Sequence, residues 1–291
     1  MENMKELIKQ LNEACNSYYN KNKPTMSDYE FDNLYSQLVK MEIETGIIYS
    51  NSPTQKIGYE VKSELEESIH SHPMLSLDKC HDESDLIKFA GDNDCVLSVK
   101  CDGLTNSLRY LDGKLISAET RGNGITGSNV LHNVLTMNNV PQTISYLGEL
   151  IIDGETIIDY NSFSQINESL PEGEKYKHPR NLASASLTLL DSSIASQRKM
   201  KFIGWKIIKG FDEIDSNFFR LKEVGKLGFD IVPMWTYTNK SSDKDNITNM
   251  LENLKDNADN IGLPMDGAVM SIDSISYGNS LGTTGKFPRH S

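Results

Sequence analysis

The sequence has few cysteines, no long apolar run and no surplus of basic residues. Its four cysteines form no C-x-x-C pair, which argues against a disulfide framework and a structural zinc site and favours a reducing compartment. No run approaches the roughly 18 to 20 apolar residues that cross a bilayer, and the charged residues 1–10 are not typical of a secretory signal. We therefore expect a cytoplasmic protein without a membrane segment.

The charge balance is acidic, with 29 Lys and Arg against 41 Asp and Glu and a formal net charge of −12. Neutralising DNA phosphates requires clustered Lys and Arg, so this balance argues against a chain that grips duplex DNA unaided, although a local basic groove remains compatible with it. The hydrophobic fraction of 37% is ordinary for a globular protein. A length of 291 residues favours two domains.

Residues 1–45 carry the spacing of two helices, with apolar residues recurring every three or four positions on either side of Pro24. Ser27 begins the second helix with a glutamate three residues later, the arrangement of a capping box. The polar and acidic stretch that follows indicates a linker. We expect a helical domain with its linker at residues 1–69 and a second domain at residues 70–291.

In the second domain, short β-rich runs replace the helical pattern. The expected strands are residues 96–100, 107–111, 114–120, 150–158, 201–208 and 267–272. The expected helices are residues 82–90, 160–169 and 243–257. Strands with interspersed helices and no regular βαβ alternation predict an α+β fold with antiparallel sheets.

The sharpest local feature is Lys100-Cys101-Asp102-Gly103, directly after an apolar run. Because side chains alternate along a strand, Lys100 and Asp102 are expected on the same face. A nucleophilic lysine must be neutral, whereas an ordinary lysine with a pKa of about 10.4 is almost fully protonated at pH 7. The four residues alone are equally compatible with an unremarkable lysine beside a turn.

Residues 99–141 resemble the nucleotidyltransferase core of NAD⁺-dependent DNA ligases in residue order and spacing. Further matches follow the same order: Asn51-Ser52-Pro53-Thr54-Gln55, His72-Pro73-Met74-Leu75-Ser76-Leu77-Asp78, Asp153-Gly154-Glu155, Pro179-Arg180-Asn181, Leu263-Pro264-Met265-Asp266-Gly267 and Leu281-Gly282. The resemblance implies a helical domain that binds nicotinamide mononucleotide (NMN), followed by a covalent-ligase-type, ATP-grasp-like nucleotidyltransferase domain of antiparallel sheets with flanking helices.

The resemblance also implies a reaction. Lys100 would take the adenylyl group of NAD⁺ as a phosphoramidate, releasing NMN, with Asp102 assisting near the ribose and the reacting phosphate. The other catalytic residues implied are Arg121 for AMP and the DNA 5′-phosphate, Glu155 for the ribose and a Mg²⁺ ion, Arg180 for phosphate, and Asp266 for metal and catalysis. The residues implied at the adenylate are Ser76, Leu77, Gly103 and Trp205, whose ring would stack on adenine.

The N-terminal helices indicate the cofactor. Tyr18 and Tyr19, with Asp28, Phe31 and Asp32, resemble the part of these ligases that clasps the NMN half of NAD⁺. Aromatic rings stack on nicotinamide, and acids bond ribose hydroxyls and offset the positive ring. ATP-dependent ligases lack this domain, so its presence favours NAD⁺. An amphipathic hairpin that packs its aromatic residues inward is the alternative.

Each candidate has a plainer structural interpretation. Arg121 lies in a Gly-rich turn, Glu155 is compatible with a solvent-facing strand position, and Trp205 follows apolar residues and is compatible with core packing. His70, His72 and His81 have metal-like spacing but no matching acid or cysteine constellation, so we interpret them as surface or loop histidines.

Several positions depart from the family pattern. Ser98, Asn123, Ser128, Asp153, Thr188 and Ser271 replace family residues near the site, Ser271 standing where the family has a lysine. The chain ends at Ser291, before the expected last lysine strand, OB fold, zinc finger and helix-hairpin-helix region.

These departures leave three hypotheses. The chain is an adenylation subunit of a DNA ligase for replication and repair, such as a split phage ligase whose second subunit supplies the rest and which acts on nicked duplex DNA in the bacterial or host cytoplasm. It is otherwise a degenerate relative that binds a nucleotide or a partner, or a nucleotidyltransferase with another acceptor.

Overall fold

The computed structural model describes residues 2–21, 26, 28–45, 52–53, 64–80, 82–238, 244–284 and 288–291. The chain divides into two compact units, Met1–Glu60 and Val61–Ser291. The expected boundary near residue 69 falls later than this division, because β1 (Glu67–Ile69) pairs antiparallel with β5 (Thr126–Ser128) and so belongs to the second unit.

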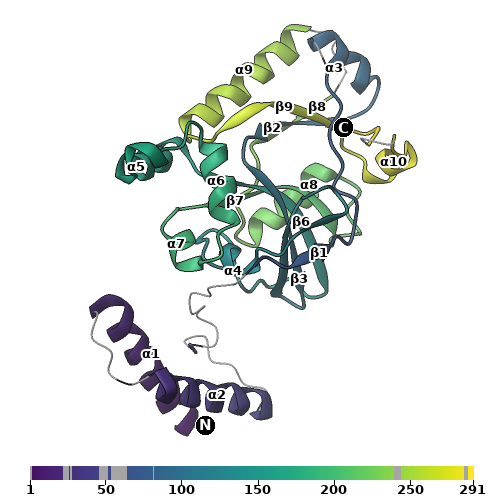
Figure 1. Cartoon of the computed structure of the whole chain (residues 1–291). Coiled ribbons are helices and arrows are strands. Elements are labelled where there is room, and N and C mark those ends of the chain that lie inside the picture. Colours follow the sequence, from purple (N-terminus) through teal and green to yellow (C-terminus); the bar gives the residue numbers. More distant parts are fainter. Residues whose placement is uncertain are drawn as a thin grey trace. The chain divides into compact units, whose positions relative to one another are not determined.

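The first unit contains the two helices expected from apolar spacing, α1 (Glu2–Lys21) and α2 (Asp28–Thr45) (Figure 1). Their contact buries four apolar side chains: Met4, Ile8, Leu11 and Leu38. Full burial of such a side chain stabilises a fold by about 1.5–3 kcal/mol, so this small cluster holds the two helices together. The expected capping residue Ser27 lies outside the described residues.

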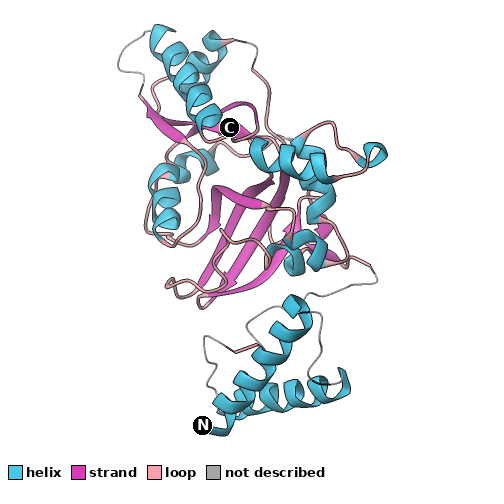
Figure 2. Cartoon of the chain, turned by 90° about the vertical axis from the view of Figure 1, so that its left-hand side faces the viewer, coloured by secondary structure: helices cyan, strands magenta, loops and turns pink. Residues whose placement is uncertain are grey.

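Two antiparallel sheets form the frame of the second unit (Figure 2). The three-stranded sheet has the order β8-β2-β9, with β8 (Met234–Tyr237), β2 (Cys95–Cys101) and β9 (Met265–Ile272). The four-stranded sheet has the order β4-β3-β6-β7, with β4 (Lys114–Thr120), β3 (Leu104–Leu111), β6 (Glu149–Ile157) and β7 (Lys201–Lys209). The predicted α+β class with antiparallel sheets is confirmed.

Helices and one 3₁₀ turn complete the second unit. They are α3 (Glu83–Ala90), α4 (Leu131–Val134), α5 (Tyr160–Ser169), the 3₁₀ turn η1 (Glu172–Glu174), α6 (Pro179–Leu187), α7 (Ser192–Ser196), α8 (Asn217–Lys226), α9 (Lys244–Asn260) and α10 (Ile275–Ser280). Asp82 begins α3 by accepting a hydrogen bond from the amide of Asp85, which satisfies one free donor at the helix start. No helix in the described part of the chain combines the length and apolar character that a membrane span requires.

Two apolar cores hold the second unit together. The first packs the four-stranded sheet against α6 and α8, with Leu108, Tyr110 and Ile152 fully buried. The second packs the three-stranded sheet against α3 and α9, with Leu97 and Leu254 fully buried. Strand β2 contributes to both cores, since Val96 joins the first and its neighbours join the second. The end of β2 is therefore held firmly, which matters for the lysine found there.

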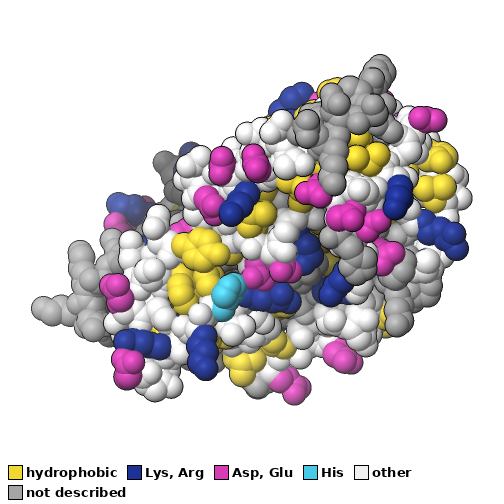
Figure 3. Space-filling model, turned by 90° about the horizontal axis from the view of Figure 1, so that it is seen from above, with side chains coloured by type: hydrophobic (Ala, Val, Ile, Leu, Met, Phe, Trp, Pro, Cys, Tyr) yellow, Lys and Arg dark blue, Asp and Glu magenta, His cyan; other side chains and the backbone are white. Residues whose placement is uncertain are grey.

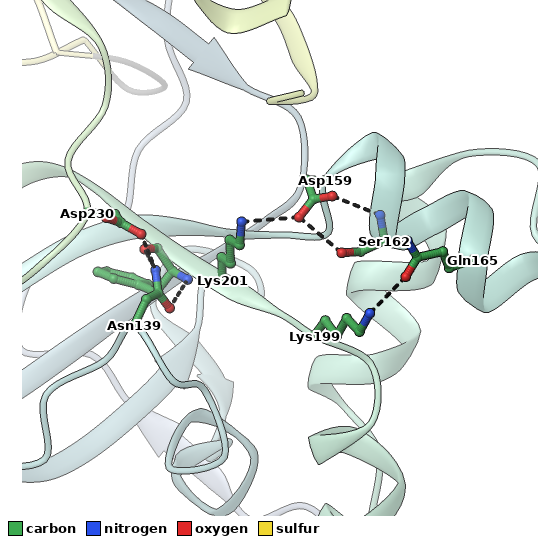
Figure 4. Close-up of polar contacts among 8 residues, drawn as sticks. Asn139, Asp159, Ser162, Gln165, Lys199, Lys201 and Asp230 are labelled. Atoms are coloured by element: carbon green, nitrogen blue, oxygen red, sulfur yellow. Dashed lines mark hydrogen bonds and ion pairs between the residues drawn. The ribbon is translucent and has the colours of Figure 1, made fainter. Parts of the chain in front are cut away.

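Side chains complete the outer edge of β7 (Figure 4). The amide of Asn139 donates to the carbonyl oxygen of Phe202 at 2.8 Å and accepts from the amide of Phe202 at 3.1 Å. Two residues further along the strand, the amide of Gly204 donates to the carbonyl oxygen of Asp230, and its carbonyl oxygen accepts from the amide of Val232. The first residue of the strand, Lys201, forms an ion pair at 3.2 Å with Asp159, the N-cap of α5. These contacts fix the strand that carries Trp205.

Candidate active site

Lys100 lies near the end of β2, opposite Gly267 of β9. The register of the two strands shifts between Lys100 and Cys101, and Gly267 has a φ of 145°, a region that favours glycine. This irregularity brings the carboxylate of Asp266 against the ammonium of Lys100, and the two form an ion pair. The hydrogen bond and the charge of Lys100 lower the pKa of Asp266. Both side chains are about half exposed.

The neighbouring Cys101 is not a competing nucleophile. Its side chain is partly buried, and burial together with the nearby charge of Glu155 raises its pKa to about 12. Because the thiolate is the reactive form, a thiol with that pKa stays protonated and inert. Lys100 is therefore the nucleophile candidate of this strand.

Asp102 lies beside the first turn of α6. Its carboxylate oxygens lie 3.2 Å from Nη1 of Arg180 and 3.7 Å from Nδ1 of His178. The Asp102 side chain is mostly buried, whereas that of Arg180 is exposed. Gly103 follows, and a Cβ atom there would lie 2.2 Å from the carbonyl oxygen of Thr156, so this close approach to β6 requires glycine.

Glu155 lies on β6 opposite Thr105 of β3. Burial raises the pKa of Glu155 to about 7, although the Thr105 hydroxyl, the charge of Arg180, the backbone of Gly103 and the charge of Lys100 all act in the opposite direction. These interactions bring Glu155 together with Arg180 and Lys100. Four of the sequence-predicted residues therefore converge with Asp102 in one place: Lys100, Glu155, Arg180 and Asp266.

Arg121 follows β4 and connects to this cluster through β3. Its amide donates to the carbonyl oxygen of Thr105 at 2.9 Å. Its guanidinium donates from Nε to the carbonyl oxygen of Met74 at 3.1 Å and from Nη2 to Oγ of Ser76 at 2.7 Å. The segment that carries Ser76 and the half-buried Leu77 thus lies directly beside Arg121.

The aromatic candidates lie in both units of the chain. Trp205 is half-buried on β7 and packs against the second core. Part of its ring surface is therefore used in core packing, the plainer role that the sequence also allowed. Tyr18 and Tyr19 lie on α1, and Asp28, Phe31 and Asp32 lie on α2. Their side chains lie outside the part of the structure that is described.

The interpretation as surface or loop histidines is confirmed for His70 and His72, which lie outside helices and strands, but His72 is mostly buried. Its side chain is 15% exposed, and Nε2 lies 2.8 Å from Oδ2 of the buried Asp153. His70 is half-buried and bonds the carbonyl oxygen of Arg121 at 3.0 Å, and His81 lies outside the described residues. The signal that was available is the position of Asp153 on the same strand face as Glu155, where a buried acid requires a partner.

Three of the substituted positions lie on β2, on β9 and at the end of α6. Ser98 approaches the carbonyl oxygen of Val269 at 3.5 Å, and Ser271 lies on β9 opposite Val96. Thr188 donates to the carbonyl oxygen of Ser184 at 3.0 Å, at the C-terminal end of α6. Thr188 and Ser271 do not supply the positive charge expected from the family pattern, and Ser98 does not supply the expected acid. On the face in Figure 3, basic and acidic side chains are interspersed, and they form no continuous basic surface there.

Oxygen ligands for a hard cation are present around Lys100. Mg²⁺ usually takes one or two carboxylates together with substrate phosphates rather than an all-protein cage. Asp266 and Glu155 both act electrostatically on Lys100 and fit that requirement. Within the described residues, no group of three or more His, Cys, Asp or Glu side chains forms a self-sufficient metal site.

Two family models match this chain. Residues 62–291 match the NAD-dependent DNA ligase adenylation domain, and residues 1–58 match the DNA ligase-like, N-terminal NAD⁺-binding domain. By its antiparallel α+β fold and lysine-centred site, the chain falls in the class of adenylating nucleotidyltransferases. It belongs to the family of NAD-dependent DNA ligases, as the matches over both units show.

Curated relatives named DNA ligase agree with this family. The relative from Ruminiclostridium cellulolyticum is 40% identical over 292 residues, covering 99% of this chain and 44% of the relative. That from Lachnoclostridium phytofermentans is 41% identical, covering 98% of this chain and 43% of the relative. The chain thus spans less than half the length of these relatives.

Solved structures show a more distant likeness. Pmar-Lig_PreS3 has a TM-score of 0.36 and 11% identity, over 69% of this chain and 43% of that one. A Naegleria gruberi RNA ligase mutant with AMP and Mn has a TM-score of 0.35 and 12% identity, over 74% of this chain and 58% of that one.

Proposed function

We propose that this chain transfers AMP from NAD⁺ to its own Lys100 and releases NMN, the first step of DNA nick ligation. The observation that carries the proposal is the convergence of Lys100, Asp266, Glu155 and the Asp102–Arg180 pair in a member of the NAD-dependent ligase family. The proposal predicts a covalent protein–AMP adduct that depends on one lysine.

The reaction balances as a single displacement. The lone pair of Lys100 Nζ attacks the phosphorus of the adenylyl half of NAD⁺ and forms a P–N bond. The phosphoanhydride P–O bond breaks, NMN leaves with its electron pair, and the amine loses a proton. Phosphoryl transfer of this kind depends on positioning and on charge stabilisation more than on acid–base chemistry.

The surrounding residues supply that stabilisation. We assign the exposed guanidinium of Arg180 and the remaining N–H groups of Arg121 to phosphate oxygens, because each guanidinium carries five donors in a fixed fork. Glu155 faces the ribose, and Asp102 orients Arg180 through their ion pair. Ser76, Leu77, Gly103 and Trp205 are assigned to the adenylate, with the partly exposed ring of Trp205 stacking on adenine.

Lys100 has to leave its ion pair before it reacts, because an ammonium bound to a carboxylate has no free lone pair. Asp266 therefore holds the resting lysine in place and releases it when the nucleotide binds. A Mg²⁺ ion held by Asp266 and Glu155 would supply positive charge at the phosphates.

The helical unit selects NAD⁺ over ATP as the donor of AMP. We assign Tyr18 and Tyr19 to the nicotinamide ring and Asp28, Phe31 and Asp32 to the NMN ribose and the positive ring. The family match of residues 1–58 to an NAD⁺-binding domain supports this assignment.

The wider role follows from the relatives. We propose nicked duplex DNA as the final substrate, a function in replication and repair, and the cytoplasm as its place. Because the chain spans 44% of a relative's length, we propose that a second subunit or further domains, as in a split phage ligase, supply the DNA-encircling part.

Intact-mass measurement of the 291-residue chain with NAD⁺ and Mg²⁺ tests the proposal. We expect one added AMP, absent from Lys100→Ala and from reactions with ATP in place of NAD⁺. Equal labelling from ATP, or an adduct on another residue, would overturn it. Nucleotide binding without any adduct would favour the non-catalytic alternative, which the serines at positions 98 and 271 suggest.

A further inference from the structure

A buried polar pair lies behind the site, on the strand that carries Glu155. Asp153 precedes Glu155 by two residues on β6 and so shares its strand face. Its side chain is 4% exposed, and Oδ2 accepts a hydrogen bond from Nε2 of His72 at 2.8 Å. The other oxygen, Oδ1, is buried without a hydrogen-bond partner in the described structure. A buried carboxylate of this kind is costly unless other contacts compensate it.

Lys206 provides the compensating charge. It lies opposite Asp153 across the β6–β7 pairing. Burial lowers the pKa of Lys206, and the charge of Asp153 acts against that shift. Nζ of Lys206 also lies 3.2 Å from Nε2 of His290. The Asp153–His72 hydrogen bond therefore lies directly beside the buried Lys206.

His72 connects this strand to the segment that holds Arg121. Two residues further along, the amide of Met74 donates to the carbonyl oxygen of Gly124 at 3.0 Å. The same segment offers the Met74 carbonyl oxygen to Nε of Arg121 and Oγ of Ser76 to its Nη2. The segment is thus tied by its backbone to the loop after Arg121 and by the His72 side chain to β6.

We propose that His72 and Asp153 are positioning residues for adenylation, which fix the segment of residues 72–76 on β6 and thereby orient the guanidinium of Arg121. The inference rests on the proposed function as far as catalysis is concerned. It adds two residues that touch neither the nucleotide nor the nucleophile.

The physical reason is the limited freedom of the guanidinium. With Nε and Nη2 bound to Met74 and Ser76, the plane of the fork is set, and its other N–H groups point in fixed directions. Loss of the His72–Asp153 bond frees the segment and with it that plane. A misplacement of about 1 Å at a reacting phosphate costs up to about a hundredfold in rate.

A double-mutant cycle tests the inference on the full chain. We expect His72→Leu to lower kcat/KM for adenylation from NAD⁺ by tenfold or more, chiefly through kcat, in the wild-type background. In the Arg121→Ala background, the same change is expected to alter the rate less than twofold, because no guanidinium remains to be oriented. Equal losses in both backgrounds would show that His72 acts only on general stability and would overturn the inference.

Variants of Asp153 and Glu149 serve as controls. Asp153→Asn keeps an oxygen acceptor for His72 and is expected to lose less activity than Asp153→Leu. Glu149→Gln makes the same acid-to-amide change on the same strand, at an ion pair with Arg109 at 2.7 Å, and is expected to leave adenylation unchanged. If His72→Leu does not unfold cooperatively, His72→Asn, whose side chain is too short to reach Asp153, replaces it.

A measurement without turnover separates this inference from the proposed function. The Nε–H proton of Arg121, bonded to the Met74 carbonyl oxygen, is expected to give a slowly exchanging NMR signal in the wild type and in Glu149→Gln. It should exchange rapidly in His72→Leu and Asp153→Leu. Persistence of the signal in both would overturn the positioning role even if the chain is adenylated. Absence of an adduct with a His72-dependent signal would instead count against the proposed function alone.

Discussion

Burial destabilises the charged form of Glu155 more than its hydrogen bonds and the neighbouring cations stabilise it. The pKa of Glu155 therefore lies at about 7 instead of the ordinary 4.5. Below pH 4.5 the group is protonated in both the folded and the unfolded chain, and stability is unaffected. As the pH rises from 4.5 to 7, the unfolded chain releases the proton while the folded chain keeps it. Stability is therefore lost across this window, and the loss is complete above pH 7.

This linkage gives a prediction for Glu155→Gln. At pH 8 the variant is expected to have a larger free energy of unfolding than the wild type, by about 1–3 kcal/mol, because no buried charge has to be maintained. At pH 4 the difference should vanish. Urea denaturation at pH 4, 6 and 8 measures it, and an equal difference at all three values would contradict the assigned burial.

At the scale of elements, the strands were the most predictable part. The six expected strands correspond to β2, β3, β4, β6, β7 and β9, because alternation and β-branched residues mark them locally. The expected helices at residues 82–90, 160–169 and 243–257 correspond to α3, α5 and α9. Two of the helices not expected, α6 and α10, are short and rich in serine, alanine or glycine, so they carry little periodic apolar signal.

The contacts that assemble the site could not be predicted in the same way, because they are non-local. The Lys100–Asp266 pair joins positions 166 residues apart, and the His72–Asp153 pair joins positions 81 residues apart. The first depends on the register shift after Lys100. Resemblance supplied Lys100, Glu155 and Asp266 as candidates, but His72 had no local pattern to identify it.

Gly103 sets how closely the connection between β2 and β3 approaches β6. Gly103→Ala is expected to destabilise the fold by about 3 kcal/mol or more and to lower adenylation, because the new Cβ would overlap the carbonyl oxygen of Thr156. Gly173→Ala is the matched control, since nothing lies within 4 Å of a Cβ there, and its effect should stay within about 0.5 kcal/mol. Thermal unfolding and adduct formation measure both. Equal stability of the two variants would contradict the close packing.

At the scale of the whole molecule, the proposed function divides the labour between the two units. Removal of residues 1–60 is expected to eliminate adenylation from NAD⁺, because the NMN leaving group loses the residues assigned to orient it. Asp32→Ala in the full chain should have the same effect more mildly. The rate of adduct formation measures both effects, and circular dichroism controls for folding. An undiminished rate in the shortened chain would make the helical unit a structural accessory.

The chain alone is expected not to seal a nicked duplex through multiple turnovers. Its net charge of −12 offers little general attraction to DNA, whose binding draws on Lys and Arg contacts to phosphates. Thr188 and Ser271 also stand where cations are expected. A nick-sealing gel with the 291-residue chain, with and without a partner chain that carries an OB fold, measures this. Robust sealing by the chain alone would contradict the need for a partner.

The two hydrogen bonds from the Asn139 side chain to the backbone of β7 affect the tendency of the chain to aggregate. An open strand edge is a template for pairing with another chain and so for aggregation, and the Asn139 amide occupies both backbone groups of Phe202. Asn139→Leu is therefore expected to raise light scattering at high protein concentration, whereas Asn257→Leu, on the exposed surface of α9, should not. Equal scattering from both variants would mean that the neighbouring segment at Asp230 and Val232 protects this edge by itself.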